Sequence, residues 1–246
     1  MTRYEEAFAA LHVVIDPELD EPITDLGFVR ALMVSPTGGV TLNLRLPTSF
    51  CSPNFAYLMA SDAKDALAAL DWTNTVVVEL DDHHDSEIIN AGLAADAGYR
   101  GTFGHEALDS LDELRRTFQR KAHTAALERC LTALLRADRG RSEESMGEVT
   151  LADLPDDATT AALLRRRGAL GLSTAPDALV LVDHQGNGYA DVPLALRRAR
   201  STRISIDGNA HFCRGLLRTR YGHADAESAG QTRDPTFIPL SALLPA

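Results

Sequence analysis

The sequence is poor in cysteine, with three residues in a chain of 246, at positions 51, 130 and 213. A small, odd number of cysteines argues against a disulfide framework and fits a reducing compartment. Cys51 has no C-x-x-C partner, which excludes a local zinc knuckle and a local redox dithiol. Any cysteine with a chemical role is therefore a thiol or a metal ligand.

Long apolar runs are also missing. No stretch approaches the roughly 18 residues that a membrane-spanning helix needs. The first residues, MTRYEEAFAALHVV, are acidic and amphipathic, and they lack the basic start and apolar stretch of a signal peptide. We therefore expect a cytoplasmic protein with no membrane partner.

A surplus of positive charge is missing as well. The formal net charge is −11, whereas nucleic-acid binding needs a surplus of Lys and Arg on one face. Basic clusters occur in LLRRRGALG and ALRRARSTR, and both are typical of solvated helix faces or of a patch for an acidic protein. We expect no nucleic-acid partner.

The common nucleotide and hydrolase motifs are absent too. The sequence contains no G-x-S-x-G elbow, no G-x-x-x-x-G-K-[ST] loop and no G-x-G-x-x-G after a strand. ATP-dependent and dinucleotide-dependent chemistry are therefore disfavoured.

What the first hundred residues do contain is an alternation of helix and strand patterns. The patterns predict a helix over 2–14, a hairpin of strands 28–36 and 40–46, a helix over 52–70, a strand over 75–80 and a helix over 85–98. Ser52 and Pro53 are typical of a helix start. The fold class is α/β (α+β), with a small mixed sheet made of a β-hairpin and a βαβ unit flanked by helices.

The rest of the chain is predicted to form a smaller α/β segment. An amphipathic helix is expected from 107 to 137, and its apolar stripe should pack the C-terminal half against the N-terminal unit. Further helices are expected at 157–170, 192–200 and 209–221, strands at 178–183 and 203–206, and an irregular tail. The predicted division is a domain over 1–100, a long connecting helix over 101–138, a linker over 139–149 and an α/β segment over 150–246.

The expected topology brings chemically active residues together. An antiparallel hairpin places the loop before its first strand beside the loop after its second, and a parallel βαβ unit opens its last loop at the same edge. The three loops converge into one rim. Its candidate residues are Asp16, Glu18 and Asp25 from the first loop, Thr48 and Cys51 from the second, and His83, His84, Asp85 and Glu87 from the third.

Two of these loops carry a family resemblance. VIDPELDEPITDLGFVRAL, with its Asp-Pro-Glu and Asp-Leu-Gly signatures, and PTSFCSP resemble the iron-sulfur cluster assembly domain family, which includes the PaaD- and SufT-like metal-sulfur cluster biosynthetic proteins. The resemblance covers roughly residues 1 to 100 of a longer chain. It implies a small α/β domain with one reactive cysteine, here Cys51, surrounded by Asp16, Glu18 and Thr48.

The resemblance also implies a function and partners. Such proteins assist the maturation of iron-sulfur or other iron proteins, so the expected cargo is transient iron, an iron-sulfur cluster or another transition metal. The expected partners are an apo-metalloprotein client and other assembly factors, and longer members resemble accessory proteins of binuclear-iron monooxygenases. One departure from the family is Ser52, which separates Cys51 from the proline that usually follows directly.

The chemistry of Cys51 agrees with this role. The start of a helix favours the thiolate, which is the form that binds metal. One thiolate cannot complete a four-ligand site, so another residue or a second subunit must contribute, for example in a homodimer. The bland alternative is a small buried hydrophobic residue.

The remaining candidates stay ambiguous. His83 and His84 with Asp85 and Glu87 could bind iron or zinc, or they could form a solvated turn that caps the next helix. His211 and Cys213 form a weaker pair, since a regular helix sets them about 200° apart. A non-enzymatic maturation factor is the expected function, and a metal-dependent enzyme using the histidine loop or a protein-only adaptor is the alternative.

Overall fold

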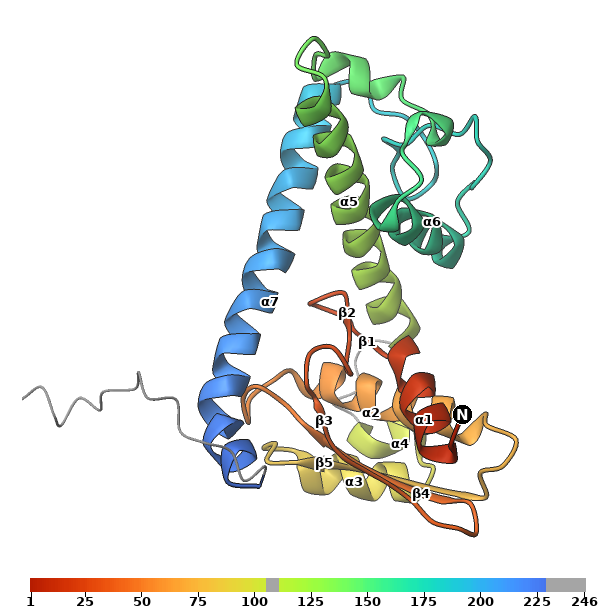
Figure 1. Cartoon of the computed structure of the whole chain (residues 1–246), viewed down its shortest axis with the longest axis vertical. Coiled ribbons are helices and arrows are strands. Elements are labelled where there is room, and N and C mark those ends of the chain that lie inside the picture. Colours follow the sequence, from red (N-terminus) through yellow and green to blue (C-terminus); the bar gives the residue numbers. More distant parts are fainter. Residues whose placement is uncertain (105–110, 229–246) are drawn as a thin grey trace, which may run out of the picture.

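The computed structural model describes residues 1–104 and 111–228 and confirms the α+β class. A small sheet with its helices forms the lower part of the molecule, and two long helices rise from it to a helical upper part (Figure 1). No helix among the described residues combines the length and the apolar character that crossing a membrane requires. Residues 107–110, the start of the helix predicted over 107–137, lie outside the described residues.

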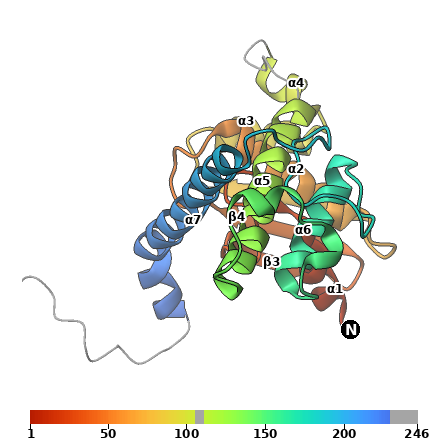
Figure 2. The ribbon, with the colours of Figure 1, turned by 90° about the horizontal axis from the view of Figure 1, so that it is seen from above.

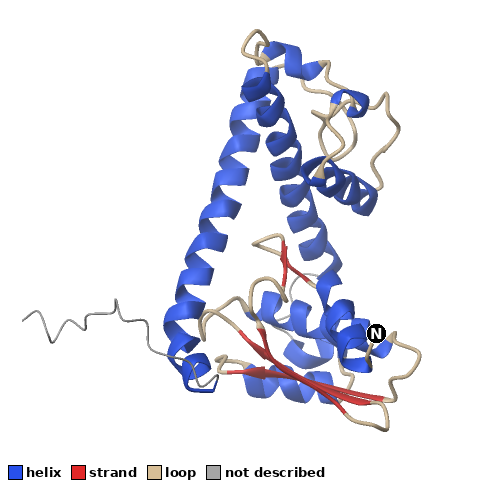
Figure 3. Cartoon of the chain, in the orientation of Figure 1, coloured by secondary structure: helices blue, strands red, loops and turns tan. Residues whose placement is uncertain are grey.

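The main sheet has three strands in the order β3-β4-β5. β3 (Val29–Val34) and β4 (Gly39–Arg45) form the predicted antiparallel hairpin, and β4 pairs in parallel with β5 (Thr75–Asp81). Helix α2 (Pro53–Ala68) makes the crossover between β4 and β5. Side chains alternate along β4 between buried and half-buried, so one face of the sheet is in the core. The predicted hairpin and βαβ unit are confirmed (Figure 3).

Short elements complete the lower part. They are α1 (Arg3–Ala10), the 3-10 helix η1 (Leu11–Val13), a small hairpin of β1 (Ile15–Asp16) and β2 (Glu21–Pro22), α3 (Ser86–Ala94) and α4 (Gly98–Phe103). Thr2 caps α1 through a capping box with Glu5. Buried apolar residues from the sheet, α1, α2 and α3 form one core, centred on residues such as Leu42, Leu44 and Ile89.

The upper part is built on three helices, α5 (Leu111–Ala137), α6 (Ala158–Leu170) and α7 (Val192–Ser228), with the 3-10 helices η3 (Glu144–Gly147) and η4 (Leu151–Asp153) between them. α5 lies between α6 and α7, and Figure 2 shows the same order from above. α5 and α7 are close at their upper ends and diverge downward, and the β1–β2 hairpin lies between them (Figure 1).

The C-terminal strands are the main error of the sequence prediction. Residues 203–206 lie within α7, and residues 178–183 form only isolated bridges, so no β-strand forms in residues 150–228. α7 joins the two predicted helices and continues to Ser228, into the stretch expected to be irregular. The reason is burial at helical spacing, because Ala199, Ile206 and Ala210 lie on one buried stripe of α7.

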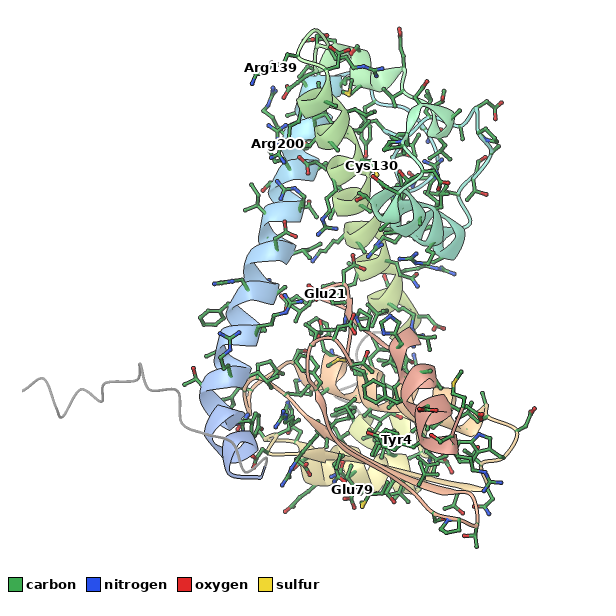
Figure 4. The ribbon with its side chains drawn as sticks, viewed as in Figure 1. Tyr4, Glu21, Glu79, Cys130, Arg139 and Arg200 are labelled. Carbon is green, nitrogen blue, oxygen red and sulfur yellow. The ribbon has the colours of Figure 1, made fainter. Side chains whose placement is uncertain are left out.

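α5 is shared by two hydrophobic cores. Its lower end belongs to the first core, where Leu111 packs and where the Phe118 ring meets Phe55 edge-on at 4.9 Å. Its upper half forms a second core with α6, α7 and residues 146–154, and this core includes Leu131 and Cys130. Cys130 is therefore a core residue, and Figure 4 shows it far above Glu79 in the sheet. The predicted packing of the C-terminal half through this helix agrees with this arrangement.

Charge is divided between the two parts of the molecule. Residues 1–104 contain 16 Asp and Glu against 5 Lys and Arg, whereas residues 111–228 contain 16 against 18. Four ion pairs between described residues of the two parts follow this division, since the arginine comes from the helical part and the acid from the lower part. They are Arg115–Asp62, Arg166–Asp20, Arg214–Glu21 and Arg220–Asp82. Opposite charge thus adds to apolar packing in joining the two parts.

Among these four ion pairs, the guanidinium of Arg166 on α6 has the most favourable hydrogen-bond geometry, because it bonds to both carboxylate oxygens of Asp20. Arg166 donates from Nε to Asp20 Oδ1 at 3.2 Å and from Nη2 to Asp20 Oδ2 at 2.7 Å, and the two side chains are only 20% and 11% exposed. A bidentate, partly buried pair contributes more than an exposed one. Asp20 also has a positive φ of 57°, which asparagine tolerates, so Asp20→Asn removes the charge and keeps the backbone.

We predict that a double-mutant cycle of Arg166→Gln and Asp20→Asn gives a coupling free energy of about 1–2 kcal/mol in urea unfolding. The exposed pair Arg141–Asp138 is the matched control and should couple by less than about 0.5 kcal/mol. Equal coupling in the two cycles would show that the Arg166–Asp20 pair does not hold the two parts together.

Candidate functional site

The candidate site lies at the edge of the sheet where β4 and β5 end. Loop 46–52 leaves β4 and loop 82–85 leaves β5, and they are joined by a hydrogen bond from the His84 N–H to the Ser49 carbonyl oxygen at 2.9 Å. The loop before β3 reaches the same edge, since the Arg45 N–H donates to the Phe28 carbonyl at 2.8 Å. The predicted convergence of three loops is therefore present in the structure.

Cys51 sits in loop 46–52, two residues before α2 begins at Pro53. Its side chain is half-buried, and its Sγ lies 3.7 Å from the Oγ1 of Thr48. The same Thr48 oxygen accepts a hydrogen bond from the Phe50 N–H at 3.1 Å, which tightens the turn before the cysteine. Thr48 is thus a direct neighbour of Cys51.

His83 holds the Cys51 loop in place. Its ring is only 5% exposed, its Nε2 donates to the Cys51 carbonyl oxygen at 2.8 Å, and its Nδ1 accepts from the Asp85 N–H at 3.1 Å. With both ring nitrogens bonded to the backbone, His83 has no nitrogen lone pair left for a metal in this geometry. The geometry therefore makes His83 a brace between the loops after β4 and β5.

The other residues of the histidine loop are dispersed. His84 is exposed and its ring contacts that of Phe50 at a centroid distance of 5.9 Å. Asp85 precedes α3 without a side-chain cap, and Glu87 is exposed in the first turn of α3. Asp25, from the first loop, is also exposed and lies 3.5 Å from His12.

No three donors of the described residues form a ready metal site. Across residues 1–104 and 111–228, no group of three or more His, Cys, Asp and Glu side chains is placed to hold an ion. His211 is exposed on α7, whereas Cys213 is half-buried, and α7 runs through both without a break. The two therefore point to different sides of a regular helix.

Asp16 is buried at the base of the first loop, with 7% of its surface exposed. Its Oδ1 accepts hydrogen bonds from the N–H groups of Glu18 at 2.9 Å and Leu19 at 2.8 Å, which turn the chain after Pro17. Burial raises the pKa of Asp16 to about 6, against the opposing effect of these two N–H groups, and the charge of Glu18 raises it further. The Asp-Pro-Glu signature thus builds a tight turn around a carboxyl that is costly to ionise.

α7 covers this rim, and no sequence pattern predicts that contact. The Arg220 guanidinium donates to the Leu46 carbonyl at 3.3 Å and, at 2.8 Å each, to the Ser49 hydroxyl and the Asp82 carbonyl. Its neighbour Tyr221 lies under the Arg45 guanidinium at 4.9 Å. One arginine from the far end of the chain therefore holds the loops after β4 and β5 together. No local motif marks Arg220, because only tertiary packing gives it this role.

Higher on α7, two more residues contact the first loop. The Asn209 amide donates to Glu18 Oε1 at 3.1 Å, and Arg214 pairs with Glu21. Gly27, which ends the Asp-Leu-Gly signature, has a positive φ of 76°, and a Cβ there would lie 3.3 Å from Leu217. The Asp-Pro-Glu and Asp-Leu-Gly signatures of the first loop therefore both lie against α7.

Residues 5–80 match the family model described as iron-sulfur cluster assembly protein. No curated protein and no solved structure gives a significant match to the chain. The matched segment runs from α1 to β5 and contains Asp16, Glu18, Thr48 and Cys51. It ends just before His83 and His84, and it does not include α5, α6 or α7.

We predict that Asp16→Asn removes a pH-dependent loss of stability. The carboxyl has a pKa of about 6 in the folded chain and about 3.9 when unfolded, so the unfolded chain releases its proton first. The free energy of unfolding is therefore unaffected by this group below about pH 4 and falls as the pH rises toward 7. The difference between variant and wild type should grow by about 2–3 kcal/mol between pH 4 and 7.5 in denaturant titrations. A flat difference would contradict this.

We predict unequal roles for the adjacent histidines. His83→Ala should lower the free energy of unfolding by about 2–3 kcal/mol, because it removes a buried ring and leaves two backbone groups unpaired. His84→Ala, an exposed neighbour, should cost less than about 0.5 kcal/mol. Alkylation of Cys51 by iodoacetamide should be faster in the His83 variant alone. Equal effects in both variants would refute the bracing role.

Proposed function

We propose that this chain is an accessory factor that carries iron or an iron-sulfur cluster to a client protein, because residues 5–80 match the family model of iron-sulfur cluster assembly proteins. The cargo binds through the thiolate of Cys51. The chain itself catalyses no reaction in this proposal, and the client is an apo-metalloprotein. A binuclear-iron monooxygenase is the client class that the long form of the chain favours, and the cytoplasm is the compartment.

The observation that carries the proposal is the placement of Cys51. The thiol stands half-buried at the rim, and its loop is held by His83 and by Arg220. A thiolate needs a fixed backbone and partial access to solvent to bind and release a soft metal. Cys130 has the same chemistry, but its side chain is buried in the upper core, where a metal or a client cannot reach it.

The incomplete donor set also supports a carrier. A protein that keeps its metal surrounds it with three or four donors, and the described residues form no such group. A carrier needs open positions for the donors of its client. The His83 and His84 loop is left out of the binding site, because both nitrogens of His83 already bond to the backbone.

We predict that Cys51→Ser lowers iron loading by about tenfold or more when the chain is reconstituted anaerobically with ferrous iron and sulfide. Iron and sulfide bound after desalting are the measurement. Cys130→Ser is the matched control and should load like the wild type. Unchanged loading of the Cys51 variant would refute the carrier function and favour an adaptor that contacts proteins only.

A further inference from the structure

One face of α7 contacts the rim at regular intervals. Asn209 bonds to Glu18, Leu217 lies against Gly27, and Arg220 bonds to loop 46–52. These three residues are spaced by 8 and 3 positions, so all point to the same side of the helix. Cys213 is four residues after Asn209 and four before Leu217, which places its side chain on this face between the two contacts.

The surroundings of Cys213 agree with that placement. Cys51 and Cys213 are both half-buried, and both pack against the core of the lower part. Burial raises the pKa of Cys213 to about 11, and the next contributions are the negative charges of Asp16, Cys51 and Glu18. The acids of the first loop and the other cysteine are therefore close enough to act on this thiol through their charge.

Asp16 is an acid close to the Cys213 thiol. Its side chain is more than nine-tenths buried, and its Oδ1 accepts hydrogen bonds from the two N–H groups of the turn. Its negative charge is among the causes that raise the pKa of Cys213. Acids beside a thiol favour the approach of a cation.

We propose that Cys213 and Cys51 form a two-thiol site across the two parts of the chain, and that this pair binds the thiophilic cargo. The proposal rests on the proposed function and extends it to a residue outside the segment matched by the family. Two thiolates select soft metals such as iron in its sulfide clusters. They leave the remaining coordination positions to a client, in agreement with the absence of a three-donor group among the described residues.

The pairing of the thiols can be tested without iron. Phenylarsine oxide condenses with two nearby thiols: both S–H protons and the arsenic-bound oxygen leave as water, and two S–As bonds form. We expect the folded wild type to bind one equivalent, seen as a mass shift by native mass spectrometry. Cys51→Ser and Cys213→Ser should each bind about 100-fold more weakly, because the second bond becomes unavailable. Cys130→Ser should bind like the wild type.

The role in cargo binding needs a second measurement. In ferrous iron and sulfide reconstitution, Cys213→Ser should load at least about threefold less iron than wild type and Cys130→Ser. Full loading of Cys213→Ser, with loss in Cys51→Ser, would overturn this inference and leave the carrier function intact. Full loading of both variants would overturn the carrier function itself.

Two controls separate pairing from folding. Far-ultraviolet circular dichroism and thermal unfolding should match wild type in Cys213→Ser, and Cys213→Ala provides a second replacement that keeps a small apolar side chain. Monothiol alkylation of Cys51 should persist in both. An arsenical that binds either single-cysteine variant as tightly as wild type would show that the two thiols do not act as a pair.

Discussion

The arrangement of the rim depends on one guanidinium. Arg220 is a rigid fork of donors, and it reaches three acceptors on two loops that are far apart in sequence. Those loops follow neighbouring parallel strands, so their carbonyl groups point outward at the sheet edge with few partners of their own. Arg220 satisfies them and at the same time fixes the height of α7 above the sheet. The register of every other α7 residue on the rim follows from that contact.

The rest of the helical part supports the same contact. α7 could not hold its position through its lower end alone, since a single helix end has little apolar area to bury. Its upper half is locked to α5 by Glu128, which is fully buried and accepts from Arg200 at 3.2 Å and from Arg203. α5 in turn packs into the lower core through Phe118. α5 therefore contacts both the lower core and α7, and α7 contacts the loops at the sheet edge. We call this closed set of contacts between α5, α7 and the sheet the frame.

The sequence predicted the sheet and not the frame. Alternating residues in 40–46 and β-branched residues in 75–80 are local signals, so the hairpin, the βαβ unit and the rim loops with Cys51 followed from them. The residues around 203–206 carry a similar local signal, yet their burial against other parts of the chain makes them helical. Arg220 and the position of Cys213 depend on contacts with residues more than 130 positions away, and no local pattern records such contacts.

A site made of Cys51 and Cys213, as proposed above, would suit the release of a metal as well as its binding. A metal held by four protein donors leaves only when several bonds break together, whereas a pair of thiolates leaves room for incoming donors to bind before either bond is lost. A rigid frame is useful for such an exchange, because Cys51 and Cys213 come from different parts of the chain and their separation is set by α7. The charge division adds to this effect. The first loop, with Asp16 and Glu18, surrounds the thiols with negative charge, which attracts cations and disfavours a second thiolate until a cation is present. In the proposed site, cargo binding and ionisation of the two thiols are therefore coupled.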